Sequence, residues 1–274
     1  MTYINLINFA KNKYKNYSNV VNFELLFFCS ETVKNKTLFV INRNKEIDFS
    51  KKNFLLLLKR YYVDKEPLGT ILGFINFLNV KIKINKNVLV PRTETELITE
   101  KSIKLIKKYK ISSVYDLCCG SGNIGICIKK NINNTNVTCV DINKDAIACT
   151  KINSKINNVQ VKTICGDFYK SIKKKIPCIV CNPPYVDINY IDKNMTKYET
   201  KISFNNSKDN LFFYKKIIEN INKIMTKKFL IIFEIGYDQK TKLKKILEKN
   251  NLSNFSKFYK DYSHNDRMLV INRQ

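Results

Sequence analysis

The strongest constraint on the fold is an alternation of strand-like and helix-like segments that begins at Ser112 and runs towards the end of the chain. Short apolar runs rich in β-branched residues predict strands at 113–117, 136–141, 159–165, 177–181 and 228–235. The longer segments between them predict helices at 123–131, 143–156, 211–225 and 238–250. Repeated βα units predict a parallel sheet with helices on both faces, so the expected fold class is α/β.

Both ends of this alternation carry further elements. Two more strands are predicted at 254–260 and 266–272, and the turn-like residues 263–266 (Ser-His-Asn-Asp) between them predict an antiparallel hairpin at the sheet edge. Before the alternation, Glu94 to Tyr109 predicts a helix, because its first turn is acidic and its last turn contains lysine.

The first part of the chain has a different character. The apolar stretches Phe23–Phe28 and Phe54–Leu58 lack the alternation of a strand, so residues 1–66 are expected to form a small helical domain. Pro67-Leu68-Gly69 interrupts this pattern, and Ile71–Phe77 with Val80–Ile84 predicts a hairpin. We therefore expect a hairpin linker at residues 67–90 and a catalytic domain at 91–274.

Composition limits the class of protein more weakly. The net charge of +26 suits an acidic partner such as RNA, but a general compositional bias towards lysine is the better explanation. Nine scattered cysteines favour reduced thiols, and we find neither a signal peptide nor an apolar run long enough to span a membrane. The expected location is the cytoplasm, with an organelle as the alternative. Cys178 and Cys181 have the spacing of half a zinc site, but they fall on opposite faces of a strand, so no metal site is expected.

A glycine-containing loop follows the first strand of the alternation. Asp116 and Leu117 lead into Cys118, Cys119, Gly120, Ser121 and Gly122, and a helix then begins. Such a turn lets the backbone approach a ligand, and the helix N-terminus offers unpaired N–H groups. Asp141 ends the second strand, where a carboxylate can accept hydrogen bonds from ribose hydroxyls. Together they predict a site for a nucleoside cofactor.

Two further strand ends carry candidate site residues. After the third strand, Asp167 could accept a hydrogen bond from an adenine amino group, and Phe168 could pack on its ring, although a surface turn and a core aromatic are equally good explanations. After the fourth strand, Asn182-Pro183-Pro184-Tyr185 forms a stiff turn, because the two prolines fix φ and lack N–H donors. The Asn182 side-chain oxygen and the Pro183 carbonyl can accept both N–H bonds of a planar NH₂ group, and Tyr185 can pack over it.

These residues indicate N-alkylation. An amide nitrogen is a poor nucleophile, and two acceptors on its protons would make it more electron-rich while aiming it at an electrophilic methyl group. The only histidine is His264, and we find no Ser/His/Asp set, which argues against hydrolase chemistry.

The chain resembles the release-factor glutamine methyltransferases, also called the HemK or PrmC family. The resemblance covers nearly the whole chain. It includes Asn182-Pro183-Pro184-Tyr185 and Phe233-Glu234-Ile235-Gly236. Its most specific parts are Pro91-Arg92-Thr93-Glu94-Thr95-Glu96 and the terminal Asp261-Tyr262 with Asn265-Asp266-Arg267.

The resemblance implies a class I, Rossmann-like domain with a seven-stranded sheet, S-adenosyl-L-methionine as cofactor, and a helical N-terminal domain that recognises the substrate. The substrate would be the glutamine of the Gly-Gly-Gln loop of peptide-chain release factors, methylated at its side-chain nitrogen, N5, in support of translation termination. Asn182, Pro183, Pro184 and Tyr185 would hold the glutamine. Cys118 to Gly122, Asp141, Phe168 and Asn182 would contact the cofactor, and Glu94 would lie near its amino-acid end. A monomer that binds neither membrane nor nucleic acid stably, working near the ribosome, is expected.

One departure and two alternatives stay open. Cys118 replaces the usual first glycine of the loop, and its Cβ could narrow the turn and weaken cofactor binding. Asn-Pro-Pro-Tyr also occurs in enzymes that methylate rRNA or DNA bases, so a base N-methyltransferase is the first alternative. A binding protein that keeps the fold without transfer is the second.

Overall fold

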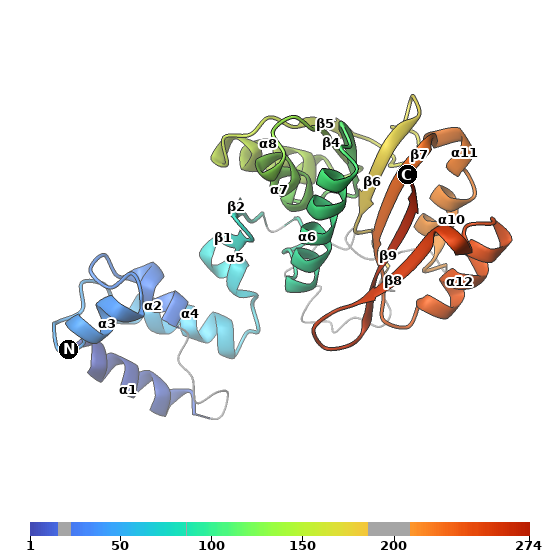
Figure 1. The fold of residues 1–274 in the computed structure, drawn as a ribbon. Coiled ribbons are helices and arrows are strands. Elements are labelled where there is room, and N and C mark those ends of the chain that lie inside the picture. Colours follow the sequence, from blue (N-terminus) through green and yellow to red (C-terminus); the bar gives the residue numbers. More distant parts are fainter. Residues whose placement is uncertain (16–22, 86, 186–208) are drawn as a thin grey trace. The chain divides into compact units, whose positions relative to one another are not determined.

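A computed structural model of the chain describes residues 1–15, 23–85, 87–185 and 209–274. The chain divides into two compact units, Met1–Gly73 and Phe74–Gln274. Figure 1 shows helices in the first and a sheet with helices in the second.

The first unit is helical, as its apolar stretches predict. It contains α1 (Tyr3–Lys13), α2 (Phe23–Cys29), α3 (Lys36–Asn42), α4 (Lys51–Tyr62) and α5 (Leu68–Leu72). Thr2, Asn35 and Ser50 accept hydrogen bonds from backbone N–H groups in the first turns of α1, α3 and α4, which satisfies donors that a helix leaves unpaired. The unit has an apolar core of its own, which includes Leu6, Leu25, Leu26, Phe54 and Leu58.

The second unit begins with a two-stranded hairpin. It consists of β1 (Phe74–Phe77) and β2 (Val80–Lys83). The prediction that the first strand starts at Ile71 was wrong, because Ile71 and Leu72 end α5. Gly73 follows with φ +75°, a left-handed conformation that ends a helix and that glycine adopts without strain.

The main sheet has seven strands in the described residues, in the order β5-β4-β3-β6-β7-β9-β8. The strands are β3 (Ser113–Leu117), β4 (Asn136–Asp141), β5 (Lys162–Cys165), β6 (Ile176–Cys181), β7 (Met225–Glu234), β8 (Ser256–Lys260) and β9 (Asp266–Arg273). The first five run parallel, and β9 pairs antiparallel with both β7 and β8. This confirms the α/β class, the seven-stranded sheet and the C-terminal hairpin at its edge.

Helices cover both faces of this sheet. They are α6 (Thr93–Lys108), α7 (Asn123–Asn131), α8 (Lys144–Ile156), α10 (Phe212–Ile218), α11 (Ile221–Ile224) and α12 (Lys240–Lys249). The predicted helix 211–225 is two short helices, because the chain turns at Asn220 and Met225 already belongs to β7. The predicted strand 159–165 is shorter, since only its second half pairs with β4.

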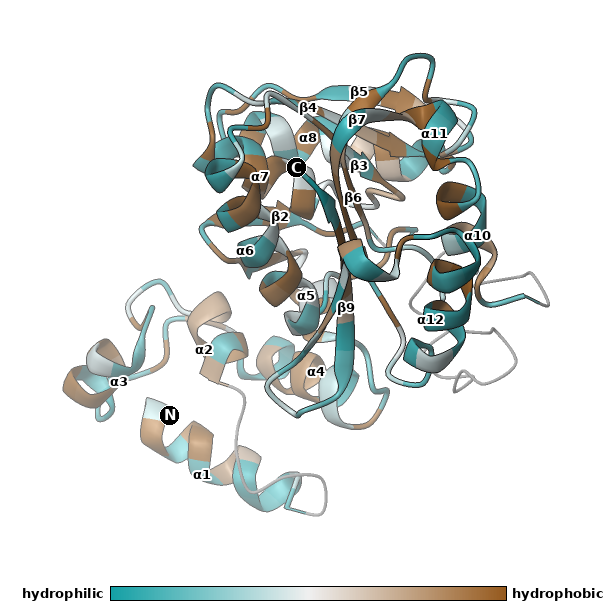
Figure 2. Ribbon diagram, turned by 45° about the vertical axis from the view of Figure 1, so that its right-hand side comes forward, coloured by the Kyte–Doolittle hydropathy of each residue, from teal (hydrophilic) through white to brown (hydrophobic). Residues whose placement is uncertain are grey.

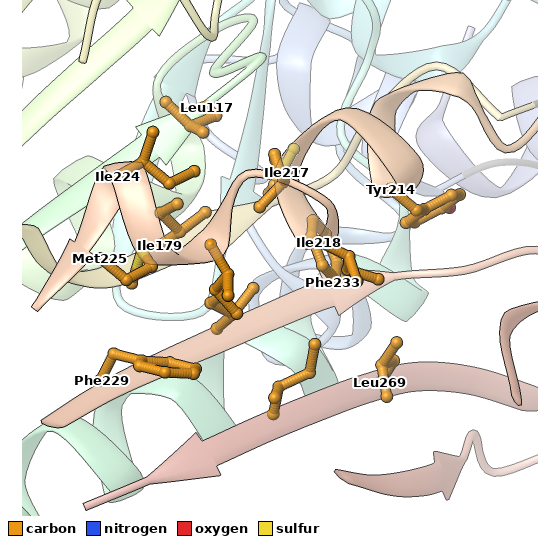
Figure 3. Packing of buried hydrophobic residues seen from close by; sticks show 14 of the residues in the cluster. Leu117, Ile179, Tyr214, Ile217, Ile218, Ile224, Met225, Phe229, Phe233 and Leu269 are labelled. Carbon is orange, nitrogen blue, oxygen red and sulfur yellow. The ribbon is translucent and has the colours of Figure 1, made fainter. Parts of the chain in front are cut away.

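The core lies in two layers, one on each face. In β6, Ile179 and Cys181 face the layer under α10 and α12, and Cys178 and Val180 face the layer under α6 and α7. Figure 2 shows apolar central strands flanked by helices that are apolar on one side and polar on the other. Figure 3 shows the first layer from close by, with Ile218 of α10 beside Phe233 of β7.

The two cysteines of the half zinc motif are therefore separate, fully buried core residues. Burial raises the pKa of the Cys178 thiol far above its usual range, because an apolar core disfavours the charged thiolate. Among the described residues, none of the helices combines the length and apolar character that crossing a lipid bilayer demands.

Candidate functional site

The candidate residues converge because their strands end together. In the sheet register Leu117 lies beside Val140 and Cys181, and Asp141 lies beside Cys165. The loops after β3, β4, β5 and β6 therefore start at one edge, the carboxyl edge of the parallel strands. The strand order reverses between β3 and β6, and open α/β sheets bind ligands at such a point.

The loop after β3 is tightly wound. Cys118, Gly120 and Gly122 all have positive φ, at 59°, 55° and 78°. A Cβ on Gly122 would lie 2.7 Å from the Thr150 side chain, so this glycine is required by close packing against α8. A Cβ on Gly120 would meet only Val88, at 3.8 Å, so the side of Gly120 is open. In the predicted glycine loop, Gly122 thus packs against α8, whereas Gly120 has space beside it for a ligand.

The carboxylate of Asp141 holds this loop in place. Its Oδ2 accepts from the Gly120 N–H at 2.8 Å, and its Oδ1 accepts from the Asn143 N–H at 2.9 Å. Burial raises the pKa of Asp141, although both N–H groups act to lower it. Each oxygen has a second lone pair that can accept from a ligand hydroxyl.

Ile142, which directly follows Asp141, was missed in the sequence. Its side chain is 64% exposed, although it stands at the end of an otherwise buried strand. An exposed apolar side chain beside the predicted nucleoside site is well placed to cover a flat apolar ring. The available signal was an apolar residue directly after the acidic end of a strand.

Asp116 is a second carboxylate at this edge whose importance the sequence did not reveal. Its side chain is fully buried, and Oδ2 accepts from the Gly125 N–H at 2.8 Å. Its Oδ1 has no hydrogen-bond partner among the described residues. Burial raises the pKa of Asp116 to about 7, and the neighbouring Asp141 charge adds to that effect. A buried, half-paired carboxylate suits a ligand that brings positive charge or a donor.

Asn182 is the first residue after β6 and is tied to α6 by its side chain. Its Nδ2 donates to Thr95 Oγ1 at 3.2 Å, and Thr95 Oγ1 donates to Glu234 Oε2 at 2.7 Å. Within the part of the chain that the structure describes, no donor is bonded to Asn182 Oδ1 or to the Pro183 carbonyl. These are the two acceptors that the sequence suggested for an NH₂ group.

Tyr185 is held from the other side by the same carboxylate. Its hydroxyl donates to Glu234 Oε1 at 2.9 Å. Burial raises the pKa of Tyr185 well above its usual range, and the Glu234 charge adds to this, so the hydroxyl stays protonated and remains a donor. The Arg267 guanidinium is close to both residues, and its Nε donates to Asp261 Oδ2 at 3.3 Å.

The C-terminal motif residues owe their positions to a turn. Asp261 Oδ1 accepts from the backbone N–H groups of Ser263 and Asn265, and this orders the β8–β9 connection. Arg267 then lies in β9, next to the end of β7 that carries Glu234. Of the C-terminal motif Asn265-Asp266-Arg267, it is therefore Arg267 that lies at the site, beside Glu234. The spacing of the motif in the sequence did not show this.

The residues after β5 form a capped turn beside a buried aromatic ring. Asp167 Oδ1 accepts from the backbone N–H groups of Tyr169 and Lys170 and so caps a turn. Phe168 is 6% exposed, and its ring packs 4.9 Å from that of Phe213, centroid to centroid. Gly166 N–H donates to the Asp141 carbonyl at 2.9 Å, which brings this turn to the same edge. The adenine contact suggested for Phe168 remains a prediction.

Comparisons with known proteins place the chain in a family. Residues 95–202 match the family described as "Methyltransferase small domain". The release factor glutamine methyltransferase of Mycoplasma mycoides subsp. mycoides SC is 34% identical over 274 residues, which cover 95% of this chain and 96% of that one.

Two solved structures share the fold. The ribosomal protein L11 methylase of Lactobacillus delbrueckii subsp. bulgaricus has a TM-score of 0.51 and 16% identity, over 74% of this chain and 99% of that one. The 16S rRNA methyltransferase RsmC of T. thermophilus, in complex with AdoMet and guanosine, has a TM-score of 0.51 and 10% identity, over 73% of this chain and 50% of that one.

Proposed function

Because the chain belongs to the release factor glutamine methyltransferases, we propose that the carboxyl edge of its sheet binds S-adenosyl-L-methionine together with the side chain of a release-factor glutamine. The reaction is the methylation of that glutamine. The observation that supports this use of the edge is the pair of oxygens at Asn182 and Pro183, which have no donor among the described residues and follow directly after β6.

The residues at this edge fit the cofactor chemically. The open side of Gly120 leaves room for a ligand beside the loop of Cys118, Cys119, Gly120, Ser121 and Gly122. Asp141 would accept from the ribose hydroxyls, and Ile142 and Phe168 would cover the adenine. The half-paired carboxylate of Asp116 suits the positive charge of this ligand. When bound, S-adenosyl-L-methionine supplies an electrophilic methyl group on a sulfonium.

The chain's own groups then orient the nucleophile. Asn182 Oδ1 and the Pro183 carbonyl accept the two N–H bonds of the glutamine amide, which fixes its plane and makes its nitrogen more electron-rich. Pro184 keeps the turn stiff, and the Tyr185 ring packs over the amide and excludes water. The proton leaves after the nitrogen has been alkylated, so the chain needs no strong base.

Transfer of labelled methyl groups tests this function. The purified chain is incubated with labelled S-adenosyl-L-methionine and, in turn, a release factor, the same factor with Gln→Ala in its Gly-Gly-Gln loop, or rRNA. We expect label on the intact factor only. Label on rRNA would favour the base N-methyltransferase, and label on neither would favour a binding protein without transfer.

The remaining features are part of the same proposal. The helical residues 1–66 would contact the release factor, residues 67–90 would link them to the catalytic part, and residues 91–274 would carry the chemistry. The nine free thiols suit the reducing conditions of the cytoplasm, where release factors act beside the ribosome. We propose a monomer that needs no stable nucleic-acid contact.

A further inference from the structure

A buried carboxylate connects both ends of the Asn-Pro-Pro-Tyr turn. Glu234 is the last residue of β7 and is 2% exposed. One of its oxygens accepts from Thr95 Oγ1 at 2.7 Å, and the other accepts from the Tyr185 hydroxyl at 2.9 Å. Thr95, equally buried in the first turn of α6, also accepts from Asn182 Nδ2 at 3.2 Å. The connection runs from Asn182 to Thr95 to Glu234 to Tyr185.

The directions of these hydrogen bonds are fixed by chemistry. An ionised carboxylate can only accept, so the single proton of the Thr95 hydroxyl must point at Glu234. Thr95 can then only accept from its other neighbour, Asn182. A side-chain amide offers either NH₂ or oxygen, and only NH₂ can satisfy Thr95. The amide oxygen of Asn182 must therefore face away from Thr95.

We propose that Glu234 and Thr95 are positioning residues that set the orientation of the Asn182 amide and anchor the Tyr185 ring. This inference rests on the proposed function, in which Asn182 Oδ1 accepts a hydrogen bond from the substrate amide. A reversed Asn182 would present its NH₂ group to the NH₂ group of the glutamine, and two donors repel each other. The buried carboxylate thus specifies that the turn binds a donor.

The burial of Glu234 has an energetic cost that supports a functional role. A carboxylate removed from water is unfavourable unless strong donors compensate it, and here they come from Thr95 and Tyr185, with the Arg267 charge nearby. Burial raises the pKa of Glu234 even with these partners present. An apolar residue of similar size would cost the fold less, so packing alone does not account for a carboxylate here.

Substitutions on one helix separate positioning from packing. Thr95 and Thr99 are both buried in α6, one turn apart, but the Thr99 hydroxyl only donates to the Thr95 backbone carbonyl. Thr95→Val removes the link to Asn182 and Glu234, Thr95→Ser retains it, and Thr99→Val is the matched control. For Thr95→Val we expect kcat for release-factor methylation to fall about 10- to 100-fold, as misplaced reacting groups do. We expect Thr95→Ser and Thr99→Val to stay near wild type, and titration calorimetry to show little change in S-adenosyl-L-methionine affinity for all three.

Glu234→Gln provides a second test that keeps the shape of the side chain. Glutamine has one acceptor and one donor where glutamate has two acceptors, so its NH₂ group must face the hydroxyl of either Thr95 or Tyr185. That hydroxyl then accepts instead of donating, and its own proton loses its place in the connection. We expect kcat to fall by a similar factor, while denaturant unfolding shows a stability equal to or above that of the wild type. A merely structural carboxylate would show the opposite combination, with lost stability and unchanged kcat.

The outcomes distinguish this inference from the proposed function. Should the wild-type chain fail to label the release factor, the proposed function itself is wrong. If the wild type is active but Thr95→Val and Thr99→Val have equal kcat, the function stands and the positioning role is wrong. Should Thr95→Val not fold, the kcat of the isosteric Glu234→Gln variant decides, and an unchanged kcat overturns the inference.

Discussion

At the scale of single residues, the site contains a side chain in a conformation that favours glycine. Cys118 has φ 59°, in the left-handed region where the Cβ of an L-residue lies too close to the backbone. The sequence showed that a glycine of the family pattern is missing here, and the structure shows that the turn keeps the shape of a glycine turn. Neighbouring contacts hold it, because Cys119 N–H donates to the Val140 carbonyl and Gly120 N–H donates to Asp141.

The cost of this conformation is measurable by comparing two small residues. Cys118→Gly and Cys118→Ala both remove the sulfur, but only alanine keeps a Cβ at positive φ. We expect the glycine variant to be the more stable of the two by about 1 kcal/mol, the usual cost of a left-handed L-residue. Urea unfolding of both variants measures the difference. Equal stabilities would mean that the turn relaxes when the sulfur is absent.

Asn182 is the residue on which methyl transfer should depend most. Asn182→Ala removes one of the two oxygens proposed to orient the amide, and we expect turnover to fall about 10²-fold or more, as when a preorganised polar group is lost from an active site. S-adenosyl-L-methionine affinity should fall less, because the loop of residues 118–122 and Asp141 remain. Steady-state kinetics together with calorimetric binding separate the two effects. An equal loss of both would make Asn182 chiefly a cofactor residue.

At the scale of elements, the short hairpin is attached to the main sheet's helices through asparagine side chains. Asn157 of the α8 C-terminus accepts from the Lys81 N–H at 3.0 Å and donates to the Lys81 carbonyl at 2.8 Å. Asn153, one turn earlier, pairs with Lys83 in the same way and also donates to the Ser121 carbonyl. These amides occupy the free edge of β2 as a neighbouring strand would, and Asn153 joins the hairpin to the glycine loop.

This attachment predicts a local change on substitution. Asn157→Ala removes both bonds to Lys81 and leaves those to Lys83 intact. We expect hydrogen exchange of the Lys81 amide to accelerate at least about tenfold, since a lost hydrogen bond is worth roughly 1 kcal/mol or more, while the Lys83 amide changes less. Asn134→Ala, at an exposed position in the α7–β4 turn, is the control. Equal acceleration at Lys81 and Lys83 would show that the hairpin opens as one unit.

At the scale of the whole molecule, strong local patterns predicted most of the fold. The strands 113–117 and 136–141 and the helix 123–131 agree with the structure to the residue, because apolar runs between clear turns leave little freedom. The break at Asn220 was missed, because helical propensity continues through it and tertiary packing decides where the chain turns. The predicted strand order placed the candidate site correctly at the carboxyl edge of the sheet. It could not predict the roles of Asp116, Thr95 and Glu234, because these depend on burial and on partners that are distant in sequence.

Buried carboxyl groups make the stability of the whole molecule depend on pH in a specific direction. Asp116, Asp141 and Glu234 have pKa values raised by burial, that of Asp116 to about 7 from an ordinary 3.8. A carboxyl whose pKa is raised on folding holds its proton more tightly in the folded chain, so stability is greatest below the unfolded pKa and falls as pH rises through the folded pKa.

Carboxyls whose pKa values are lowered on folding, among them Asp48 and Asp261, act in a separate, more acidic range. The pKa of Asp48 is lowered because hydrogen bonds, chiefly from Thr32, outweigh the effect of burial, and that of Asp261 is lowered by its Asn265 and Arg267 contacts against the same effect. Their stabilisation is present above the unfolded pKa of 3.8 and is lost only as pH falls below it. Between pH 5 and pH 8 the change of stability with pH is therefore set by the carboxyls whose pKa values are raised.

We accordingly expect the free energy of unfolding to decrease from pH 5 to pH 8 in the absence of ligand. Asp116 alone would account for up to about 3 kcal/mol of this decrease, because the slope acts from pH 5 to its folded pKa of about 7 and each pKa unit corresponds to roughly 1.4 kcal/mol. Denaturant titrations at constant ionic strength measure the slope, and Asp116→Asn should flatten it. A bound cation should flatten it as well, because positive charge beside Asp116 favours the ionised carboxylate. A stability that rises over this range, or a slope unchanged by Asp116→Asn, would mean that Asp116 is fully ionised at neutral pH and that burial does not raise its pKa.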